Sequence, residues 1–439
     1  MNAATPDPQD GGVALSSISG LDPAALFSFP LDDFQLEAIG ALNQGHSVVV
    51  SAPTGSGKTL IGEYAIHRAL AHGQRVFYTT PLKALSNQKL RDFREQFGAD
   101  RVGLMTGDLT ANREAPIVVM TTEIFRNMLY AEIEDGDDPL EGVEAVVLDE
   151  CHYMNDSQRG TVWEESIIHC PPAIQLVGLS ATVANAGQLT DWIEQVHGPA
   201  DLIVSDFRPV PLQFSFCSAK GLHPLLNEQG TGLHPNCKVW RAPKGHHRRG
   251  KNPKPPQPEP PSMAFMVAQL VERKMVPAIV FLFSRRGCDK SVRDLLKASL
   301  VNEQEARELR LALEAFAQTS PEAVRDGIHA EALLRGVAAH HAGVLPAWKE
   351  LIEQLFQRGL VKVVFATETL AAGINMPART TVISALSKRT ENGHRPLMAS
   401  EFLQMAGRAG RRGLDTQGYV VTMQSRFEGV REAGQLATS

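Results

Sequence analysis

The sequence predicts an α/β protein with two parallel-sheet domains, and three observations support this prediction. Short apolar runs rich in β-branched residues alternate with stretches of helical periodicity over most of the 439 residues. Such alternation is typical of strand–helix units, in which helices cover both faces of a parallel sheet. Polar motifs follow several of the strands, at the edge where such sheets bind ligands. The alternation is interrupted once, from Ser218 to Ser262, by a segment rich in proline and basic residues.

We therefore expect four parts: a flexible N-terminal tail (1–25), a first domain (26–217), a Pro-rich basic linker or insertion (218–262) and a second domain (263–439). The tail is polar and lacks the basic-then-apolar order of a secretory signal. Residues Lys238 to Lys254 include seven lysines and arginines and no acidic residue. This run would bind a polyanion backbone or be an ordinary solvated segment, and the sequence favours neither.

Composition limits the classes of function. A hydrophobic content of 43% suits a globular protein, and a formal net charge of -6 excludes a bulk polycation that coats nucleic acid. No apolar run approaches the ~18–20 residues that cross a bilayer, so we expect no membrane contact. The cysteines are far apart and form no C-x-x-C pair, which favours a reducing compartment and a cytoplasmic location. They are Cys151, Cys170, Cys217, Cys237 and Cys288.

The first domain is expected to begin with a helix around residues 31–40, just before the first strand. Gln35 lies on this helix. Its amide both donates and accepts hydrogen bonds, which makes it a candidate reader of an adenine edge. The alternative is a surface glutamine on an amphipathic helix, and spacing alone favours that alternative.

The strongest motif lies between a predicted strand (Val48–Val50) and a predicted helix (Leu60–Leu70). Two glycines let successive backbone N–H groups turn toward an anion, and the helix N-terminus adds partial positive charge. Lys58 would reach the outer phosphates of ATP, and the Thr59 hydroxyl would bind Mg²⁺. The alternative is an ordinary Gly-rich turn. The expected nucleotide-binding residues are Ala52, Pro53, Thr54, Gly55, Ser56, Gly57, Lys58 and Thr59.

Alternation continues through the rest of the first domain. We expect strands at 75–81, 102–105, 117–120, 143–148 and 174–179, and helices at 84–97, 123–133, 161–169 and 188–196. Parallel strands bring their carboxyl ends to one edge, so the motifs there should lie close together. These motifs are Thr79-Thr80-Pro81, Asp149-Glu150 and Ser180-Ala181-Thr182.

The second domain repeats the pattern without a phosphate loop of its own. We expect strands at 278–283, 361–366, 381–385 and 419–423, a short strand or loop at 336–341, and helices at 263–274, 295–318 and 348–356. Near its end, the stretch from Gln404 to Gly413 places three arginines among glycines. That composition suits an anion clamp, and the alternative is a basic turn.

These pieces together predict phosphoryl transfer from ATP to water. Such a reaction needs Mg²⁺, a positioned water and positive charge for the transition state. Thr59 and Asp149 would hold the metal, Glu150 would deprotonate the water, and Arg408 and Arg411 would supply charge from the second domain. The ATP site would then lie in the cleft between the two domains, and hydrolysis would move one domain against the other.

As a set, these stretches resemble the superfamily 2 DExH-box RNA helicases of the superkiller type, which feed RNA to exosome-like nucleases. The matching motifs occur in family order over about residues 29–423. They are Ala52–Thr59, Thr80–Leu85, Thr121–Glu123, Asp149-Glu-Cys-His152, Ser180–Thr182, Phe283–Arg285, His340–Gly343, Thr367–Asn375 and Gln404–Gly413. The resemblance implies two tandem RecA-like domains, ATP and Mg²⁺ as cofactors, and single-stranded nucleic acid, RNA in particular, as partner. A nuclease or another protein would be a further partner.

The resemblance also implies roles for single residues. In nucleotide binding it assigns Gln35 to the adenine, and Gly373 and Asn375 to the nucleotide side of the cleft. The contacts to the nucleic-acid backbone are assigned to Pro81, Lys83, Thr122 and Thr367. The coupling of hydrolysis to strand movement is assigned to His152, Ser180, Thr182 and Gln404. Lys388 to Pro396 lies where the family has a strand-separating hairpin, and Asn392-Gly393 is a good turn signal for it.

The sequence departs from the family at one point and leaves three alternatives open. Relatives continue with a winged helix and a helical ratchet domain, which we expect this chain to lack, either because it is a fragment or because the motor depends on partners. We expect ATP binding to survive without these domains, whereas unwinding and processivity would depend on them. The motifs contact backbone, so they do not separate an RNA helicase from a DNA repair helicase. An ATP-gated nucleic-acid clamp without catalysis is opposed by the presence of Lys58, Asp149, Glu150, Arg408 and Arg411. A small-molecule kinase would explain the phosphate loop but not the second domain.

Overall fold

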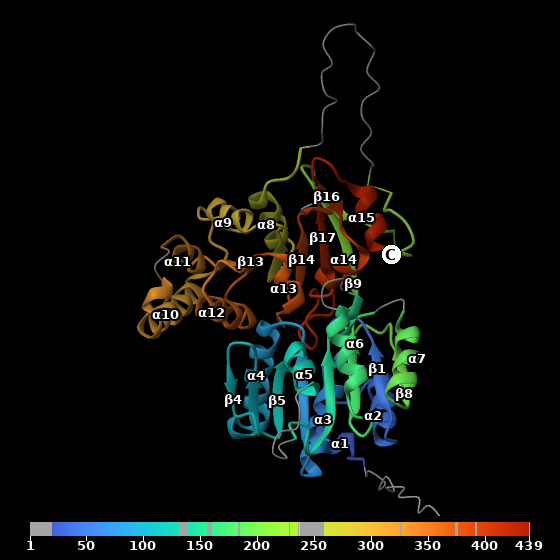
Figure 1. Ribbon diagram of the computed structural model, residues 1–439. Coiled ribbons are helices and arrows are strands. Elements are labelled where there is room, and N and C mark those ends of the chain that lie inside the picture. Colours follow the sequence, from blue (N-terminus) through green and yellow to red (C-terminus); the bar gives the residue numbers. More distant parts are fainter. Residues whose placement is uncertain are drawn as a thin grey trace, which may run out of the picture. The chain divides into compact units, whose positions relative to one another are not determined.

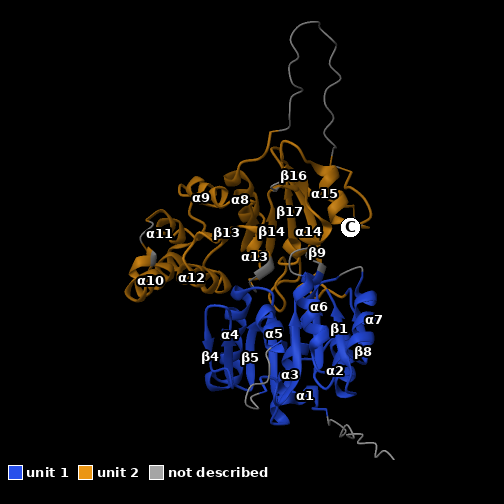
Figure 2. Cartoon of the chain, viewed as in Figure 1, with its two compact units in different colours: residues 1–52, 57–206 blue, residues 53–56, 207–439 orange. Residues whose placement is uncertain are grey.

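Two compact units make up the protein. The computed structural model describes residues 20–130, 138–155, 160–182, 185–227, 229–235, 237, 259–324, 327–373, 376–390 and 393–438. One unit comprises residues 1–52 and 57–206, and the other comprises residues 53–56 and 207–439 (Figure 2). Each has a large sheet of mainly parallel strands with helices packed on it (Figure 1). This confirms the predicted fold class.

Among the described residues, the sheet of the first unit has eight strands in the order β4-β3-β5-β2-β6-β7-β1-β8, and only β3 and β4 pair in antiparallel fashion. Its strands are β1 (Ser47–Ser51), β2 (Arg75–Thr80), β3 (Val102–Met105), β4 (Thr110–Ala111), β5 (Ile117–Thr121), β6 (Val143–Asp149), β7 (Gln175–Ser180) and β8 (Ala200–Val204). Its helices are α1 (Pro23–Leu26), α2 (Asp33–Asn43), α3 (Thr59–Ala71), α4 (Lys83–Phe97), η1 (Ala99–Arg101), α5 (Thr122–Leu129), η2 (Cys151–Asn155), α6 (Gly160–His169) and α7 (Ala186–Val196).

Both faces of this sheet are buried, which explains the continuous apolar runs of its strands. On β1, Val48 and Val50 belong to the cluster that includes Ile61 of α3. Val49 points to the opposite face and belongs to the cluster that includes Trp163 of α6. This alternation holds the strand ends in fixed positions between two layers of helices.

The second unit has a seven-stranded sheet in the order β10-β9-β17-β14-β11-β13-β12 and a separate hairpin of β15 and β16. Its strands are β9 (Leu212–Ser218), β10 (Gly221–Pro224), β11 (Ala278–Phe281), β12 (Val337–His340), β13 (Val363–Ala366), β14 (Thr380–Ile383), β15 (Ser387–Thr390), β16 (Gly393–Pro396) and β17 (Gly418–Met423). Its helices are α8 (Met263–Glu272), α9 (Arg285–Asp294), α10 (Glu303–Thr319), η3 (Pro321–Val324), α11 (Gly327–Leu333), α12 (Pro346–Gln357), α13 (Glu368–Gly373), α14 (Ala399–Ala406) and α15 (Val430–Ala437).

The boundary between the units lies earlier in the chain than the sequence indicates. Residues 207–217, predicted to end the first domain, group with the second unit, because β9 pairs in parallel with β17. Residues 221–224, predicted as linker, form β10 and pair with β9. The partner strand β17 lies at the far end of the sequence, so no local pattern shows this pairing.

The predicted tail and linker are described only in part. Residues 1–19 and 238–258 lie outside the described residues, and so does the turn at residues 391–392. Within the predicted tail, Asp22 accepts a hydrogen bond from the Ala24 backbone and caps the short helix α1. Among the described residues, no helix combines the length and the apolarity that a membrane span needs.

Candidate functional site

The predicted phosphate loop (Ala52–Thr59) connects β1 to α3, as expected. Gly55 and Gly57 have φ values of +85° and +91°, a region that glycine adopts without strain. The buried ammonium of Lys58 donates to the Ala52 carbonyl at 3.4 Å. Ser56 is wholly buried, and its Oγ has no hydrogen-bond partner among the described residues. A turned backbone, a buried cation and an unsatisfied hydroxyl fit a bound phosphate group.

Gln35 lies against this loop rather than on the surface. Its Nε2 donates to the Gly57 carbonyl at 2.9 Å, and its Oε1 accepts from the Asp32 backbone at 2.9 Å. The side chain is fully buried, so the interpretation as a surface glutamine is wrong. One N–H and one lone pair of the amide remain beyond these two bonds. Adenine recognition by Gln35 stays a prediction.

The acidic pair lies at the end of β6: Asp149 is its last residue, and Glu150 follows it. In the sheet, β7 lies between β6 and the phosphate-loop strand β1. Two donors fix the Asp149 carboxylate: the Tyr78 hydroxyl at 2.8 Å and the Glu150 backbone N–H at 3.0 Å. Glu150 itself has a φ of +55°, which costs ~1 kcal/mol or more for a residue with a Cβ. The tight turn after β6 thus keeps both carboxylates at the sheet edge where the phosphate loop also lies.

His152 joins the acidic pair to the predicted coupling motif. Its Nδ1 lies 3.3 Å from Glu150 Oε2 and 3.5 Å from the Ala181 backbone nitrogen. Burial lowers the pKa of His152, which favours the neutral ring. A neutral Nδ1 either accepts from the Ala181 amide or donates to Glu150, because a single nitrogen does one at a time. Ser180 is buried, and Thr182 is exposed just after β7.

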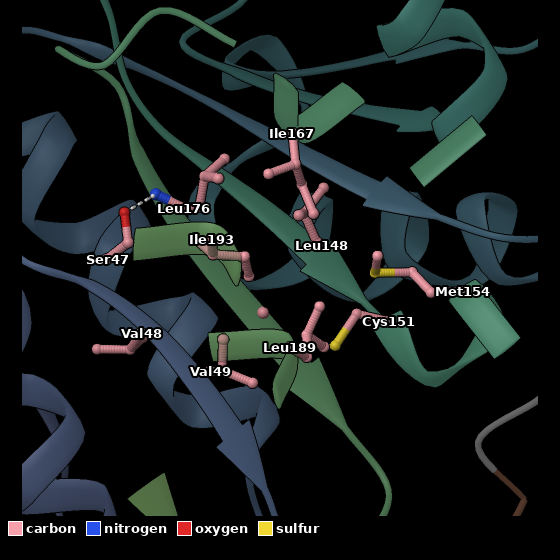
Figure 3. Close-up of a pocket in the computed structure, with 11 residues that line it drawn as sticks. Ser47, Val48, Val49, Leu148, Cys151, Met154, Ile167, Leu176, Leu189 and Ile193 are labelled. Carbon is pink, nitrogen blue, oxygen red and sulfur yellow. Dashed lines mark hydrogen bonds between the residues drawn. The ribbon is translucent and has the colours of Figure 1, made fainter. Parts of the chain in front are cut away.

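Cys151 lies between these residues but does not share their chemistry. Figure 3 shows the Cys151 side chain in a pocket whose other lining residues, such as Met154 and Leu189, are mainly apolar. Burial raises the pKa of the Cys151 thiol to about 12. The thiol therefore stays protonated and is not a nucleophile at neutral pH.

The predicted nucleic-acid contacts of the first unit follow two neighbouring strands, β2 and β5. Pro81 follows β2, and Thr122 begins α5 directly after β5. The buried Thr122 hydroxyl donates to the Thr80 carbonyl at 3.2 Å, so this side chain braces the two strand ends. Lys83 is exposed and forms an ion pair with Asp108, which is also exposed. A role of these residues in binding nucleic acid stays a prediction.

The two predicted charge donors of the second unit are bound to partners within that unit. The Arg408 Nε donates to the Ala371 carbonyl at 3.0 Å, and its guanidinium is buried. Arg411 forms a bidentate pair with Asp415 at 2.8 and 2.9 Å, and Arg379 also donates to Asp415 at 2.8 Å. Burial alone would raise the pKa of Asp415, but the hydrogen bonds from the two arginines lower it to about 2. Arg411 would have to leave the Asp415 carboxylate to act on a phosphate, whereas Arg408 donates to a neutral carbonyl and keeps its positive charge.

The remaining predicted residues of the second unit are placed as follows. Thr367 follows β13, and its hydroxyl lies 2.9 Å from that of Thr369. Gly373 is the last residue of α13, and Gln404 lies on α14. Asn375 lies outside the described residues. Their assigned roles stay predictions.

The predicted hairpin is present as β15 and β16, and ion pairs connect it to neighbouring helices. Lys388 Nζ lies 2.7 Å from a carboxylate oxygen of Glu368, in the Thr367 motif, and 2.7 Å from one of Glu401. Arg395, on the other strand, forms a bidentate pair with Glu401 at 2.9 and 2.6 Å. Burial alone would raise the pKa of Glu401, but hydrogen bonds from the two cations lower it to about 2. The hairpin is thereby tied to the helix that follows β13.

Comparison with known proteins decides the family. Residues 32–189 match the DEAD/DEAH box helicase family, and residues 313–413 match the helicase conserved C-terminal domain. The chain is 48% identical, over 98% of its length, to a chloroplastic DExH-box ATP-dependent RNA helicase of Arabidopsis thaliana. It is a superfamily 2 DExH-box helicase of the superkiller type.

Other relatives of this DExH-box helicase are the ATP-dependent RNA helicase mtr4 of Schizosaccharomyces pombe and Superkiller complex protein 2 of Mus musculus. The identities are 41% and 42%, over 92% and 91% of this chain. The chain covers 40%, 38% and 33% of the three relatives, so it spans about two fifths or less of their length. Membership of the family implies nucleotide binding.

Sequence reasoning missed three residues of the helicase that contact its motifs. Tyr78 holds Asp149 from inside a predicted strand, and Lys89 lies over the Tyr78 ring at 5.2 Å from the ring centroid. Arg208 donates to the carbonyls of Gly407 and Ala409, on either side of Arg408, at 2.9 and 2.6 Å. Tyr78 and Lys89 lie within a predicted strand and a predicted helix without any pattern that distinguishes them from structural residues, and no local signal marks Arg208.

Proposed function

We propose that the chain is the core of an ATP-dependent RNA helicase or translocase, which couples ATP hydrolysis to movement along RNA or to its unwinding in RNA processing or decay. One observation carries the proposal: His152 contacts both Glu150 and the Ala181 amide. A residue that activates water and a motif that follows a neighbouring strand are thereby linked through one side chain. The names of the relatives as RNA helicases support RNA as the substrate.

The chemistry follows from the chain's own residues. Lys58 would neutralise the outer phosphates, Thr59 and Asp149 would hold Mg²⁺, and Glu150 would accept the proton of the attacking water. Bound Mg²⁺·ATP supplies the phosphoryl group and the metal charge. Arg411, once released from Asp415, would stabilise charge in the transition state.

We also propose the setting in which this activity operates. The partner is single-stranded RNA, and a nuclease or another protein acts with the helicase. The location is the cytoplasm, which is consistent with five cysteines that are all free thiols in the structure. The exposed Lys83 supports contact with a phosphate backbone, since separation from its exposed partner Asp108 costs little free energy.

The test is ATP hydrolysis by the purified chain in three conditions: without nucleic acid, with single-stranded RNA, and with single-stranded DNA of the same sequence. Glu150→Gln is the matched inactive variant, because it keeps the shape of the side chain and removes its basicity. Binding of a fluorescent ATP analogue is measured in parallel.

We expect RNA to stimulate hydrolysis more than DNA does, and Glu150→Gln to abolish the stimulation. Stronger stimulation by DNA would replace this proposal with a DNA repair helicase. Analogue binding without hydrolysis in any condition would replace it with an ATP-gated clamp.

A further inference from the structure

Tyr78 is a buried polar residue that the proposed chemistry does not use. Its side chain is fully buried on β2, and its hydroxyl donates to Asp149 Oδ2 at 2.8 Å on the neighbouring strand β6. The other oxygen, Oδ1, accepts from the Glu150 backbone at 3.0 Å. Each carboxylate oxygen offers about two lone pairs, so a metal or its water can still bind. The two donors fix the orientation of the carboxylate before any metal arrives.

Lys89 of α4 in turn holds Tyr78. Its ammonium lies 5.2 Å from the Tyr78 ring centroid and 5.6 Å from that of Phe93. The two rings meet edge to face, with centroids 5.0 Å apart. The cation therefore reaches Asp149 through the Tyr78 ring, whose hydroxyl bonds the carboxylate.

The same helix begins at the predicted nucleic-acid contacts. Helix α4 starts at Lys83, and the Thr80 and Ser86 hydroxyls lie 2.7 Å apart, which ties the end of β2 to the first turns of α4. Lys89 lies ~9 Å along the helix axis from Lys83, at 1.5 Å per residue. If α4 moved as a rigid unit, a displacement at its start would also move Lys89.

We propose that Tyr78 is a positioning residue for the Asp149 carboxylate, and that Lys89 links its position to the nucleic-acid side of α4. RNA at the start of α4 would shift Lys89 and Tyr78 and thereby adjust the geometry in which Asp149 receives Mg²⁺. The inference has two parts: a metal arm, in which Tyr78 positions Asp149 for Mg²⁺, and an RNA arm, in which Lys89 links Asp149 to RNA at the start of α4. The RNA arm rests on the proposed function, whereas the metal arm depends only on nucleotide binding.

Tyr78→Phe tests the metal arm, because it removes one oxygen and keeps the ring. Hydrogen-bond partners of metal-binding carboxylates are worth ~10-fold or more in metal affinity. We expect the Mg²⁺ concentration for half-maximal binding of a fluorescent ATP analogue to rise ~10-fold. Binding of the analogue in EDTA should not change. Superposable Mg²⁺ curves for wild type and Tyr78→Phe would overturn the proposal.

Tyr64→Phe is the matched control, since Tyr64 is equally buried and its hydroxyl bonds Asn43 at 2.8 Å on α2. Its Mg²⁺ curve should follow that of the wild type. A rise as large as that of Tyr78→Phe would show a general effect of losing a buried hydroxyl and would overturn the specific role.

Lys89→Met and Lys89→Arg test the RNA arm in the full chain. We expect the ratio of RNA-stimulated to basal ATP hydrolysis to fall toward one in Lys89→Met and to recover in Lys89→Arg, which keeps the cation. An unchanged ratio in Lys89→Met would overturn the link to α4. If wild type itself hydrolyses no ATP with RNA, the proposed function fails, while the Mg²⁺-dependent binding arm still decides the role of Tyr78.

Discussion

The phosphate-loop site and the arginine loop (Gln404–Gly413) are built in opposite ways, although both lie on parallel-sheet units. Around the phosphate loop, two donors fix Asp149, and the buried Ser56 hydroxyl has no partner among the described residues. In the arginine loop, Arg408 is bound to the Ala371 carbonyl and Arg411 to Asp415. The first arrangement is ready for a ligand, whereas in the second Arg411 must leave Asp415 before it can act on one.

The strongest test of this comparison is Arg411→Ala. If Arg411 leaves Asp415 to stabilise the transition state, its loss should slow ATP turnover by ~1,000-fold, the scale of an arginine finger. Binding of a fluorescent ATP analogue should stay close to wild type, because the phosphate-loop site does not depend on Arg411. Steady-state turnover and analogue titration measure the two effects. Turnover near the wild-type rate would show that the pair with Asp415 is purely structural.

Glu150→Gln tests the other side of the comparison. A general base contributes ~100-fold or more, so turnover should fall by at least that factor while the analogue still binds. Single-turnover hydrolysis with a quenched time course measures the loss. If Glu150→Gln also abolished binding, the carboxylate would be needed to build the site rather than to activate water.

Asp415→Asn tests how much the pairs of Asp415 with Arg411 and Arg379 contribute to the free energy of unfolding. The pKa of Asp415 is lowered from its ordinary value of 3.8 to about 2, so its charge stabilises the fold above pH 3.8. This contribution is lost as the pH falls from 3.8 through 2. We expect Asp415→Asn to be less stable than wild type at pH 6, with the difference shrinking below pH 4. Urea unfolding at several pH values measures it. A difference that is constant with pH would exclude the two arginine pairs as its cause.

The smallest expected effect concerns the exposed pair of Lys83 and Asp108, whose side chains are 52% and 78% exposed. Exposed pairs contribute ~1 kcal/mol or less, so Asp108→Asn should leave the unfolding midpoint nearly unchanged. Asp108→Asn should tighten RNA binding, because it frees Lys83 from its partner. Lys83→Gln should weaken RNA binding and lower, by about 1, the slope of log affinity against log salt concentration. RNA titrations at several salt concentrations measure both changes in affinity. Weaker binding by Asp108→Asn would place the RNA elsewhere.

Local sequence was sufficient for most of the first unit. The phosphate loop, the Asp149 turn and the Ser180 motif each follow a strand, and the edge of a parallel sheet brings such positions together. Local spacing did not locate Gln35 correctly, because it favoured a surface position for a side chain that is buried. The family resemblance alone assigned Gln35 to the nucleotide. Burial of a polar side chain depends on what packs over it, and the sequence does not show this.

Long-range pairing and side-chain partners were beyond local reasoning. Strand β9 was assigned to the wrong side of the boundary because its partner β17 is distant in sequence. The partners of Arg408 and Arg411 were missed for a related reason: a Gly-rich basic stretch indicates an anion clamp but not the internal acceptors that occupy it. Tyr78 likewise reads as an ordinary strand residue, although it bonds to Asp149.

ATP hydrolysis by the unmodified chain at saturating single-stranded RNA, compared with the same chain without RNA, tests the central claim most directly. We expect RNA to raise the rate, and removal of Mg²⁺ with EDTA to abolish hydrolysis in both conditions. A chain that binds the ATP analogue in Mg²⁺ but hydrolyses ATP at the same rate with and without RNA would contradict an RNA-driven motor core.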